Sequence, residues 1–450
     1  MNWDMTRQGM IFRGGPRRTP FLVHRELWGS DRVTASCEEE EGDAAMEFSR
    51  DQFLEEGYVI LKQVIPPQEL DDLRQAYEKL VERQRLIWAR ERGPDDPPGG
   101  VWETNAQPRL NLGMLAGQID AQTVGAVEIW LHENTQGVSS RLLGVDDAAV
   151  TEMMLMCNPV RDHETGGHRG WHRDFYPPHT APLQGYADDI LENGPRYVQW
   201  NLPLYDDNVL WVVPGSHARL NTAEENAAMN DDARTPVPGA VQTHLAAGDG
   251  VAYILPLLHW GSRYNAKMRR TIHGGFSEYT THKDLPYLEH LSPASQESFH
   301  RWNERSARKF DMIEAALRAA IDGDGAAYQS ALDRLHPGRG TKGKLLSTIF
   351  LSKSAKRIHH LKSPDFDSLP EQERNWATSI HPMTLQWGRP LADRFSELEA
   401  ETLWTRFKFV DDLLQAQEDQ WTPGFQGEET RYYFDQVPAD LSVEAFLATF

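Results

Sequence analysis

The sequence has little cysteine, no long apolar run and a shortage of basic residues. Its 450 residues include only Cys37 and Cys157, which cannot form a disulfide framework, so we expect a reducing environment. No apolar run approaches the roughly 18–20 residues of a membrane-spanning helix, and the first residues lack the basic-then-apolar pattern of a secretory signal. These absences predict a cytoplasmic protein without a membrane span.

The charge balance is strongly acidic, with 67 Asp and Glu against 46 Lys and Arg and a net charge of −21. Such a surface repels phosphate backbones, so we expect no nucleic-acid partner. One stretch, residues 342–360 (KGKLLSTIFLSKSAKRIHH), is locally basic. Its simplest interpretation is a solvated helix face, with a docking surface or an anionic-substrate contact as alternatives.

Three regions of different pattern follow one another along the chain. Residues 1–45 are irregular and end in an acidic run, which predicts a poorly ordered N-terminal extension. Residues 46–285 hold a short strand (YVILKQV), a helix after Pro66, and then several short β-like runs separated by turn residues. Residues 286–450 return to helical spacing, with one helix expected to end at Gly323. The pattern predicts a mainly β core, a sandwich or barrel, with a helical C-terminal extension packed on it.

One histidine and one acid lie two residues apart in GWHRDFY, and they are candidate metal ligands. His172 and Asp174 would point to the same side of a strand and could hold one ion together. The pair alone is weak evidence, because His-x-acid triplets also begin at His24 and His282. A further ligand could come from His259, which follows the apolar run GVAYILPLL. Two histidines and one carboxylate are the ligands of non-haem Fe(II) sites, which keep positions open for a co-substrate and oxygen.

An arginine near the last β-like run is a candidate ligand-binding residue. In RRTIHGGF, Arg270 shares one strand side with Ile272, Gly274 and Phe276. Because this side is the more apolar, we expect it to face the inside of the β core. A buried guanidinium needs an anionic partner, which is either a carboxylate of a ligand or a nearby Asp or Glu. Spacing alone leaves both possibilities open.

Four motifs in this order resemble a known family. They are FLEEGYVILKQVIPPQELDDLRQAYEKL, WHRDF, LWVVPGSHAR, and HWGSRYNAKMRR, in which Arg270 follows His259 by eleven positions. Together they span about residues 48–280 and resemble the phytanoyl-CoA dioxygenase-like family of Fe(II)/2-oxoglutarate-dependent oxygenases. The resemblance implies a double-stranded β-helix, or jelly roll.

The resemblance also implies roles for single residues. His172, Asp174 and His259 would bind Fe(II) and carry catalysis, and Arg270, rather than Arg269, would hold the distal carboxylate of 2-oxoglutarate. Further co-substrate contacts would come from two residues whose core packing is an equally good explanation, Met154 and Trp200.

The implied reaction is hydroxylation of an unactivated C–H bond of a small molecule, with O2 as co-substrate and release of succinate and CO2. Asp174 favours hydroxylation over halogenation, because halogenating relatives carry a small residue at this position. Desaturation and ring formation stay open. Two other hypotheses stay open. The protein could be a jelly-roll enzyme that uses its metal as a Lewis acid, or a non-catalytic metal-binding or scaffold protein that uses the helical third for interactions.

Overall fold

A computed structural model describes residues 46–105, 107–160, 170–174, 180–263, 265–416 and 435–450. The chain divides into two compact units, Met1–Met46 and Glu47–Phe450. All described residues except Met46 belong to the second unit. The predicted N-terminal extension, residues 1–45, lies outside the described residues.

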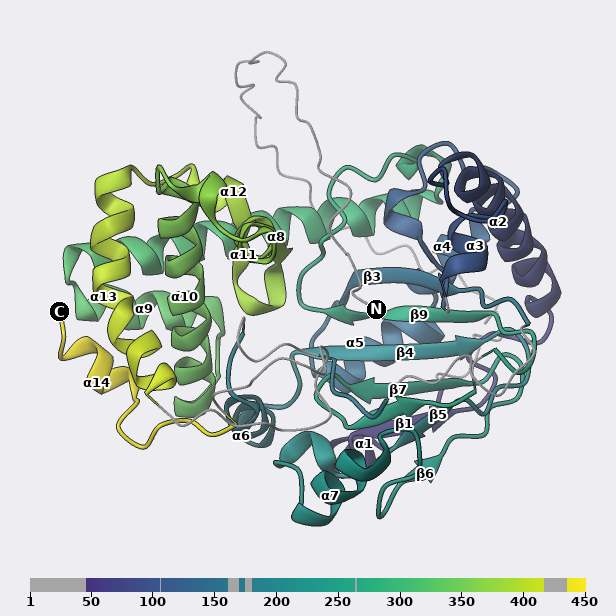
Figure 1. The fold of residues 1–450 in the computed structure, drawn as a ribbon, viewed down its shortest axis with the longest axis horizontal. Coiled ribbons are helices and arrows are strands. Elements are labelled where there is room, and N and C mark those ends of the chain that lie inside the picture. Colours follow the sequence, from purple (N-terminus) through teal and green to yellow (C-terminus); the bar gives the residue numbers. More distant parts are fainter. Residues whose placement is uncertain (1–45, 106, 161–169, 175–179, 264, 417–434) are drawn as a thin grey trace, which may run out of the picture. The chain divides into compact units, whose positions relative to one another are not determined.

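The described chain alternates between strands and helices up to Ser277 and is mostly helical afterwards (Figure 1). The strands are β1 (Tyr58–Leu61), β2 (Arg109–Asn111), β3 (Ala149–Met156), β4 (Tyr197–Pro203), β5 (Leu210–Val212), β6 (Val241–Gln242), β7 (Gly250–Ile254), β8 (His259–Gly261), β9 (Thr271–Ser277), β10 (Ile380–His381) and β11 (Gln386–Trp387). The helices are α1 (Arg50–Glu56), α2 (Leu70–Arg90), α3 (Val101–Thr104), α4 (Gly125–Glu128), α5 (Val138–Leu143), α6 (Leu183–Asn193), α7 (Ala223–Asp232), α8 (Pro293–Asp322), α9 (Gly325–Leu335), α10 (Thr341–Lys362), α11 (Glu371–Thr378), α12 (Gly388–Ala392), α13 (Glu397–Gln415) and α14 (Val443–Leu447).

Two antiparallel sheets form the β core. The larger has the strand order β1-β7-β4-β9-β3-β2, and the smaller has the order β6-β5-β8. Neighbours in this order are far apart in the sequence, since β9 pairs with β4 on one side and with β3 on the other. Every residue of β4, β7 and β9 is buried, so both faces of the large sheet are covered.

The helix predictions agree with the structure at their ends as well as their positions. The helix expected after Pro66 is α2, whose buried residues include Leu73, Tyr77 and Leu80. The helix expected to stop at Gly323 is α8, which Gly323 caps with φ = 70°, a left-handed conformation that glycine adopts without strain.

The basic stretch 342–360 forms most of α10, and the prediction of a solvated helix face is wrong. α10 packs against α6, α12 and α13, and even Lys353 and Arg357 are buried. Lys353 Nζ lies 2.6 Å from Asp411 Oδ1 on α13, so a buried ion pair compensates for its burial. The stretch looks basic in isolation because the carboxylate that pairs with Lys353 and Lys356 is supplied by Asp411, far along the chain.

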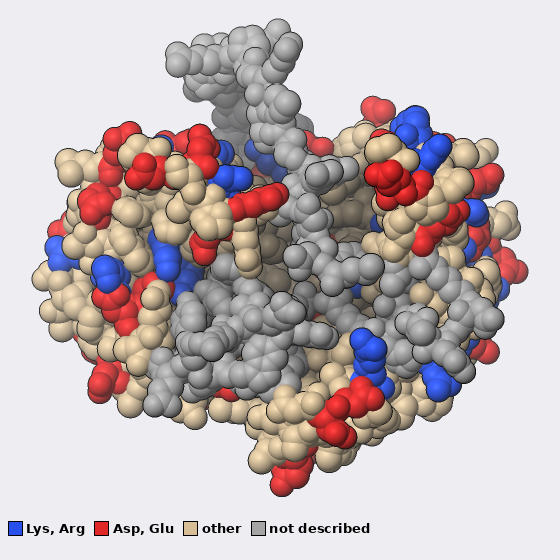
Figure 2. Space-filling view, viewed as in Figure 1, with Lys and Arg blue, Asp and Glu red and all other residues tan. Residues whose placement is uncertain are grey.

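The predicted fold class is confirmed in its coarse form, which is an antiparallel β core with a helical C-terminal part. The division into domains 46–285 and 286–450 stays a prediction, because Glu47–Phe450 form one compact unit. No described helix is both long and apolar enough to cross a membrane. The face in Figure 2 carries more acidic than basic side chains, as the net charge leads one to expect.

Candidate metal centre

Backbone pairing brings the two distant histidines together. His172 and His259 form an antiparallel bridge, in which each backbone N–H donates to the other residue's carbonyl oxygen at 2.9 and 3.0 Å. His259 begins β8, and His172 lies beside it although 87 residues separate them in sequence. The ring centroids are 4.2 Å apart. The smaller sheet therefore places both imidazoles on one site.

The same orientation is imposed on both rings by the backbone. His172 Nδ1 lies 2.8 Å from the Gly170 carbonyl oxygen, and His259 Nδ1 lies 2.9 Å from that of Leu257. A carbonyl only accepts, so each Nδ1 carries a proton and each Nε2 is the nitrogen left to face the site. This arrangement, with one ring nitrogen held by the protein and the other turned to the site, is that of metal-bound histidines.

Asp174 completes the group. Its Oδ1 lies 3.5 Å from His172 Nε2 and its Oδ2 lies 3.3 Å from His259 Nε2. Neighbouring ligands about 2.1 Å from one ion are roughly 3 Å apart, so small movements would close the three donors around a metal. Among the described residues, this is the one group of three or more His, Cys, Asp or Glu side chains with ligand atoms so close together. Two imidazoles and a carboxylate suit ferrous iron.

Arg173 anchors the strand segment between the two ligands. Its side chain is fully buried and Nη1 donates to the carbonyl oxygens of Ser216 (2.7 Å) and Pro256, while Nη2 donates to Asn221 Oδ1. Burial lowers the pKa of Arg173 to about 9. Because alternate residues of an extended segment point to opposite sides, Arg173 holds the backbone from behind while His172 and Asp174 face the site.

A polar face of the large sheet lies against the three ligands. Gln199 of β4 donates Nε2 to Asp174 Oδ2 at 2.6 Å and lies 2.7 Å from Tyr253 Oη of β7. Further along β4, Asn201 Oδ1 lies 2.7 Å from His273 Nδ1. Burial lowers the pKa of His273 to about 3, with the Arg109 charge as the next cause. Burial likewise raises the pKa of Tyr253, helped by the charge of Asp174.

The site also contains three residues that were not predicted from the sequence, Gln199, Tyr253 and Asn201, although β4 carried a signal. In YVQWNLP, tyrosine, glutamine and asparagine alternate with valine, tryptophan and leucine. A fully buried strand with one polar side is expected to face something that needs polar groups. That alternation could have indicated which side of the sheet the site occupies.

The expectation that the Arg270 side of β9 faces the site is wrong. Gln199, which contacts Asp174, pairs with Gly275 across the strands, and directly opposed residues share a face. The site side of β9 is therefore that of Thr271, His273 and Gly275. On the other side, Arg270 Nε lies 2.8 Å from Glu78 Oε1 and Nη2 lies 3.0 Å from Oε2. Arg270 thus contacts a protein carboxylate, which is one of the two possibilities that the sequence left open.

Arg269, in contrast, lies on the site side. Its Nε lies 2.7 Å from Asp207 Oδ2, and its Nη1 lies 3.3 Å from Met156 Sδ. Met156 pairs with Thr271 and so shares the face of His273. Burial alone would raise the pKa of Asp207, but the Arg269 guanidinium holds it below its usual value.

The two weaker co-substrate candidates, Met154 and Trp200, lie on opposite faces of the large sheet. Met154 pairs with His273 across β3 and β9, so it lies on the site face of the sheet. Trp200 pairs with Gly274 and donates its indole N–H to Ser139 Oγ on α5 at 2.9 Å. The structure brings Met154 to the ligand side and leaves Trp200 on the opposite side, packed under helices.

Of the other histidines near the motif, His217 has a structural contact. His217 is fully buried and its Nε2 lies 3.0 Å from the Leu54 carbonyl oxygen, which ties the GSH turn to α1. The loop histidines expected to flank the site lie outside the described residues, and they are His163, His168 and His179.

Comparison with known proteins finds a match to one family model and to a set of distant structures. Residues 53–271 match the family model described as Phytanoyl-CoA dioxygenase (PhyH), which confirms the predicted resemblance. No curated protein matches the chain.

Three of the solved structures that match do so at low similarity. AviO1 from Streptomyces viridochromogenes Tue57 is 20% identical over 51% of this chain and 92% of its own, with a TM-score of 0.35. EctD from S. alaskensis with 2-oxoglutarate and 5-hydroxyectoine is 17% identical over 53% and 78%, with a TM-score of 0.37. EvdO2 from Micromonospora carbonacea var. aurantiaca complexed with 2-oxoglutarate is 19% identical over 51% and 89%, with a TM-score of 0.33.

Proposed function

Because residues 53–271 match the phytanoyl-CoA dioxygenase family model, we propose that this chain is an Fe(II)- and 2-oxoglutarate-dependent dioxygenase. Its reaction would be hydroxylation of an unactivated C–H bond of a small molecule, with release of succinate and CO2. The observation that carries the proposal is the geometry of His172, Asp174 and His259, whose ligand atoms lie within 4.8 Å of one another. The two sheets would be the halves of a jelly roll that holds this site.

The three side chains would hold the iron from one side and leave the other side to substrates. The bound iron would supply the oxygen activation and C–H oxidation that side chains alone cannot perform. His172 and His259 would enter as neutral imidazoles, because their Nδ1 protons are held by backbone carbonyls. Gln199 would hold the Asp174 carboxylate in place through its hydrogen bond to Oδ2.

An arginine would hold the far carboxylate of 2-oxoglutarate, and two neighbouring residues are candidates. The sequence predicted Arg270, whose fork is engaged by both oxygens of Glu78. Arg269 is the better candidate, because it shares the site face and its charged contact is a single one, from Nε to Asp207, while Nη1 contacts only the Met156 sulfur. A planar guanidinium with free edges grips a carboxylate bidentately.

The test is an anaerobic titration of the iron-loaded protein with 2-oxoglutarate. A 2-oxo acid chelated to ferrous iron gives a visible charge-transfer band, so the wild type should develop this band in a saturable way. Arg269→Gln should need at least about tenfold more 2-oxoglutarate, since one charge-assisted pair contributes about 1.5–3 kcal/mol. Arg270→Gln is the matched control and should titrate like the wild type. If Arg270→Gln weakens 2-oxoglutarate binding and Arg269→Gln does not, Arg270 would be the residue that holds the far carboxylate.

The titration also separates the proposal from a scaffold function. A metal-binding scaffold would take up iron without a band on addition of 2-oxoglutarate. An enzyme that uses its metal only as a Lewis acid would turn over without consuming oxygen. Iron binding with no band in wild type, Arg269→Gln and Arg270→Gln would contradict the dioxygenase proposal.

A further inference from the structure

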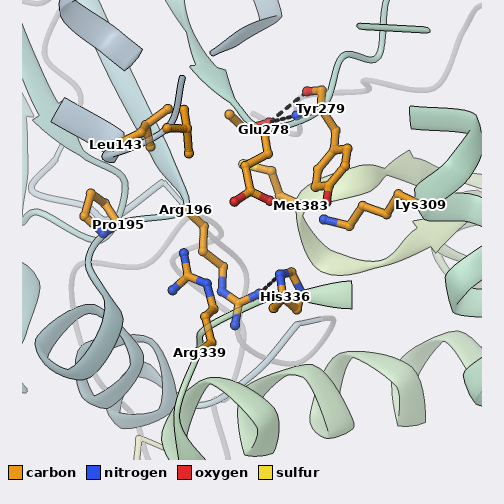
Figure 3. Close-up of a pocket in the computed structure, with 11 residues that line it drawn as sticks. Leu143, Pro195, Arg196, Glu278, Tyr279, Lys309, His336, Arg339 and Met383 are labelled. Carbon is orange, nitrogen blue, oxygen red and sulfur yellow. Dashed lines mark hydrogen bonds between the residues drawn. The ribbon is translucent and has the colours of Figure 1, made fainter. Parts of the chain in front are cut away.

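A small cavity lies where the end of β9 meets the C-terminal helices (Figure 3). It is lined from the β core by Arg196 and by the segment Ser277–Tyr279, and from the helices by Lys309, His336 and Arg339. Its volume is about 20 Å³. None of the metal ligands lines it, and neither do Gln199, Asn201, Tyr253 and His273 beside them, so it is separate from the metal centre.

Lys309 is the unusual member of this lining. It is 2% exposed, and its Nζ lies 3.5 Å from the centre of the Tyr279 ring. No other residue of the described chain forms a hydrogen bond or ion pair with it. In Figure 3 its nitrogen points into the cavity, across from the Glu278 side chain. An ammonium group buried without a hydrogen-bond acceptor is costly, and contact with an aromatic ring offsets only part of that cost.

The surrounding charges do not supply the missing acceptor. The buried carboxylate of Asp189 is shared by two guanidinium groups, with Oδ2 2.6 Å from Arg196 Nε and Oδ1 3.1 Å from Arg339 Nη1. Arg196 also donates Nη1 to His336 Nε2 at 2.7 Å. Around the cavity, the positive charges of Arg196, Arg339 and Lys309 stand against two carboxylates, those of Asp189 and Glu278, so one positive charge is in excess.

The electrostatic effect of this cluster on Lys309 supports the same picture. Burial holds the pKa of Lys309 well below its usual value. The charge of Glu278 raises this pKa, while the charges of Arg196 and Arg339 lower it further. Arg339 also lines the cavity, and its hydrogen bonds to Asp189 and to the Gly194 carbonyl oxygen are both donated by Nη1. The cavity therefore combines an unpaired amine, an arginine and room for a small group.

We propose that this cavity binds a small carboxylate-type oxyanion between Lys309 and Arg339. One negative charge would neutralise the single excess positive charge around the cavity and give the Lys309 amine an acceptor. A water needs about 10–15 Å³ of such volume, so the space fits one carboxylate group rather than a large ligand. Because β-core and helical residues both line the cavity, a bound anion would fasten the C-terminal helices to the β core.

The experiment measures thermal unfolding of the iron-free full-length protein against anion concentration at constant ionic strength. Formate, bicarbonate and acetate are titrated separately against chloride. A ligand of the folded state raises Tm in a saturable way, and we expect this for formate. Bicarbonate acting like formate while acetate fails would identify a free inorganic anion, whereas acetate acting like formate would identify the carboxylate end of a metabolite.

Variants separate binding from general salt effects. Lys309→Met keeps the length of the side chain, and it should raise the formate concentration at the midpoint at least tenfold. Without formate, this variant should be as stable as the wild type, because it no longer buries an unpaired amine. Arg339→Gln should weaken the response as well and covers the case that Lys309→Met does not fold. Lys342→Met is the matched control, since Lys342 is half exposed at the same junction and pairs with Asp188, and it should respond like the wild type.

A Tm that rises no more with formate than with chloride would overturn the proposal, as would an equal formate response in wild type and Lys309→Met. The iron-free protein is used throughout, so failure here would leave the dioxygenase proposal untouched.

Discussion

Both faces of the large sheet are buried along β4, β7 and β9, but they carry different chemistry. The face toward the metal ligands holds polar side chains from several strands, which are Glu152, Tyr197, Gln199, Asn201, Tyr253 and His273. The opposite face holds apolar ones, where Trp200 and Phe276 pack under α5 and Trp130. Apolar burial stabilises the fold, while buried polar groups must find partners to be tolerated. Polarity, rather than burial, therefore marks the functional side of this sheet.

The comparison predicts which substitutions remove function and which remove stability. On the polar face, substitutions should alter metal or co-substrate binding at little cost in unfolding free energy. On the apolar face, substitutions should lower the unfolding free energy and leave metal and co-substrate binding unchanged.

Asp174→Ala should abolish iron-dependent turnover. The variant loses the one carboxylate of the ligand set, and even changes to residues that only orient ligands weaken metals by about 10–100-fold. Its metal-free Tm should equal that of wild type or exceed it. Iron content after dialysis and Tm without metal give both numbers, and retention of stoichiometric iron would contradict the assignment.

Trp200→Ala should act in the opposite way. Removing a fully buried indole under α5 costs about 3–5 kcal/mol of unfolding free energy. The 2-oxoglutarate midpoint of protein that remains folded should stay unchanged, because Trp200 points away from the ligands. Urea unfolding measures the first effect, and the anaerobic titration measures the second. A shifted midpoint with unchanged stability would restore Trp200 as a co-substrate contact.

Gln199→Leu tests the neighbour of Trp200 on the other side of the same strand. It removes the hydrogen bond to Asp174 Oδ2, so iron should bind about 10–100-fold more weakly. Leucine keeps the size of the side chain, and the unfolding free energy should change by less than in Trp200→Ala. Competition with a coloured chelator gives the iron affinity. An unchanged affinity would mean that Asp174 needs no such support.

The smallest effect concerns pH. Burial lowers the pKa of His217 to about 4, below about 6.5 in an unfolded chain. Between these values the unfolded state binds more protons, so the stability from neutral His217 is complete above pH 6.5 and falls as pH decreases. The loss is at most about 1.4 kcal/mol from pH 6.5 to 5.5. Urea unfolding of wild type and His217→Asn at both pH values measures it, and equal slopes would show that His217 does not contribute.

Local sequence patterns predicted much of the fold and part of the site. Helical spacing located α2 and α8, and the i, i+2 spacing of His172 and Asp174 placed two ligands on one side. The pairing of β9 between β3 and β4 could not be read from the sequence, because contacts between distant strands depend on the whole fold. That gap explains the error at Arg270, whose apolar strand side packs under helices while the polar side of β9 faces the ligands. An apolar strand side predicts burial, but it does not say which of two buried sides holds a site.

The most direct test of the central claim is succinate formation from 2-oxoglutarate in the presence of O2 and Fe(II). We predict that the wild type forms succinate and CO2 in equal amounts, that a chelator stops the reaction, and that His172→Ala forms none above background. Succinate formation that is absent in the wild type, or equal in the wild type and His172→Ala, would contradict the account.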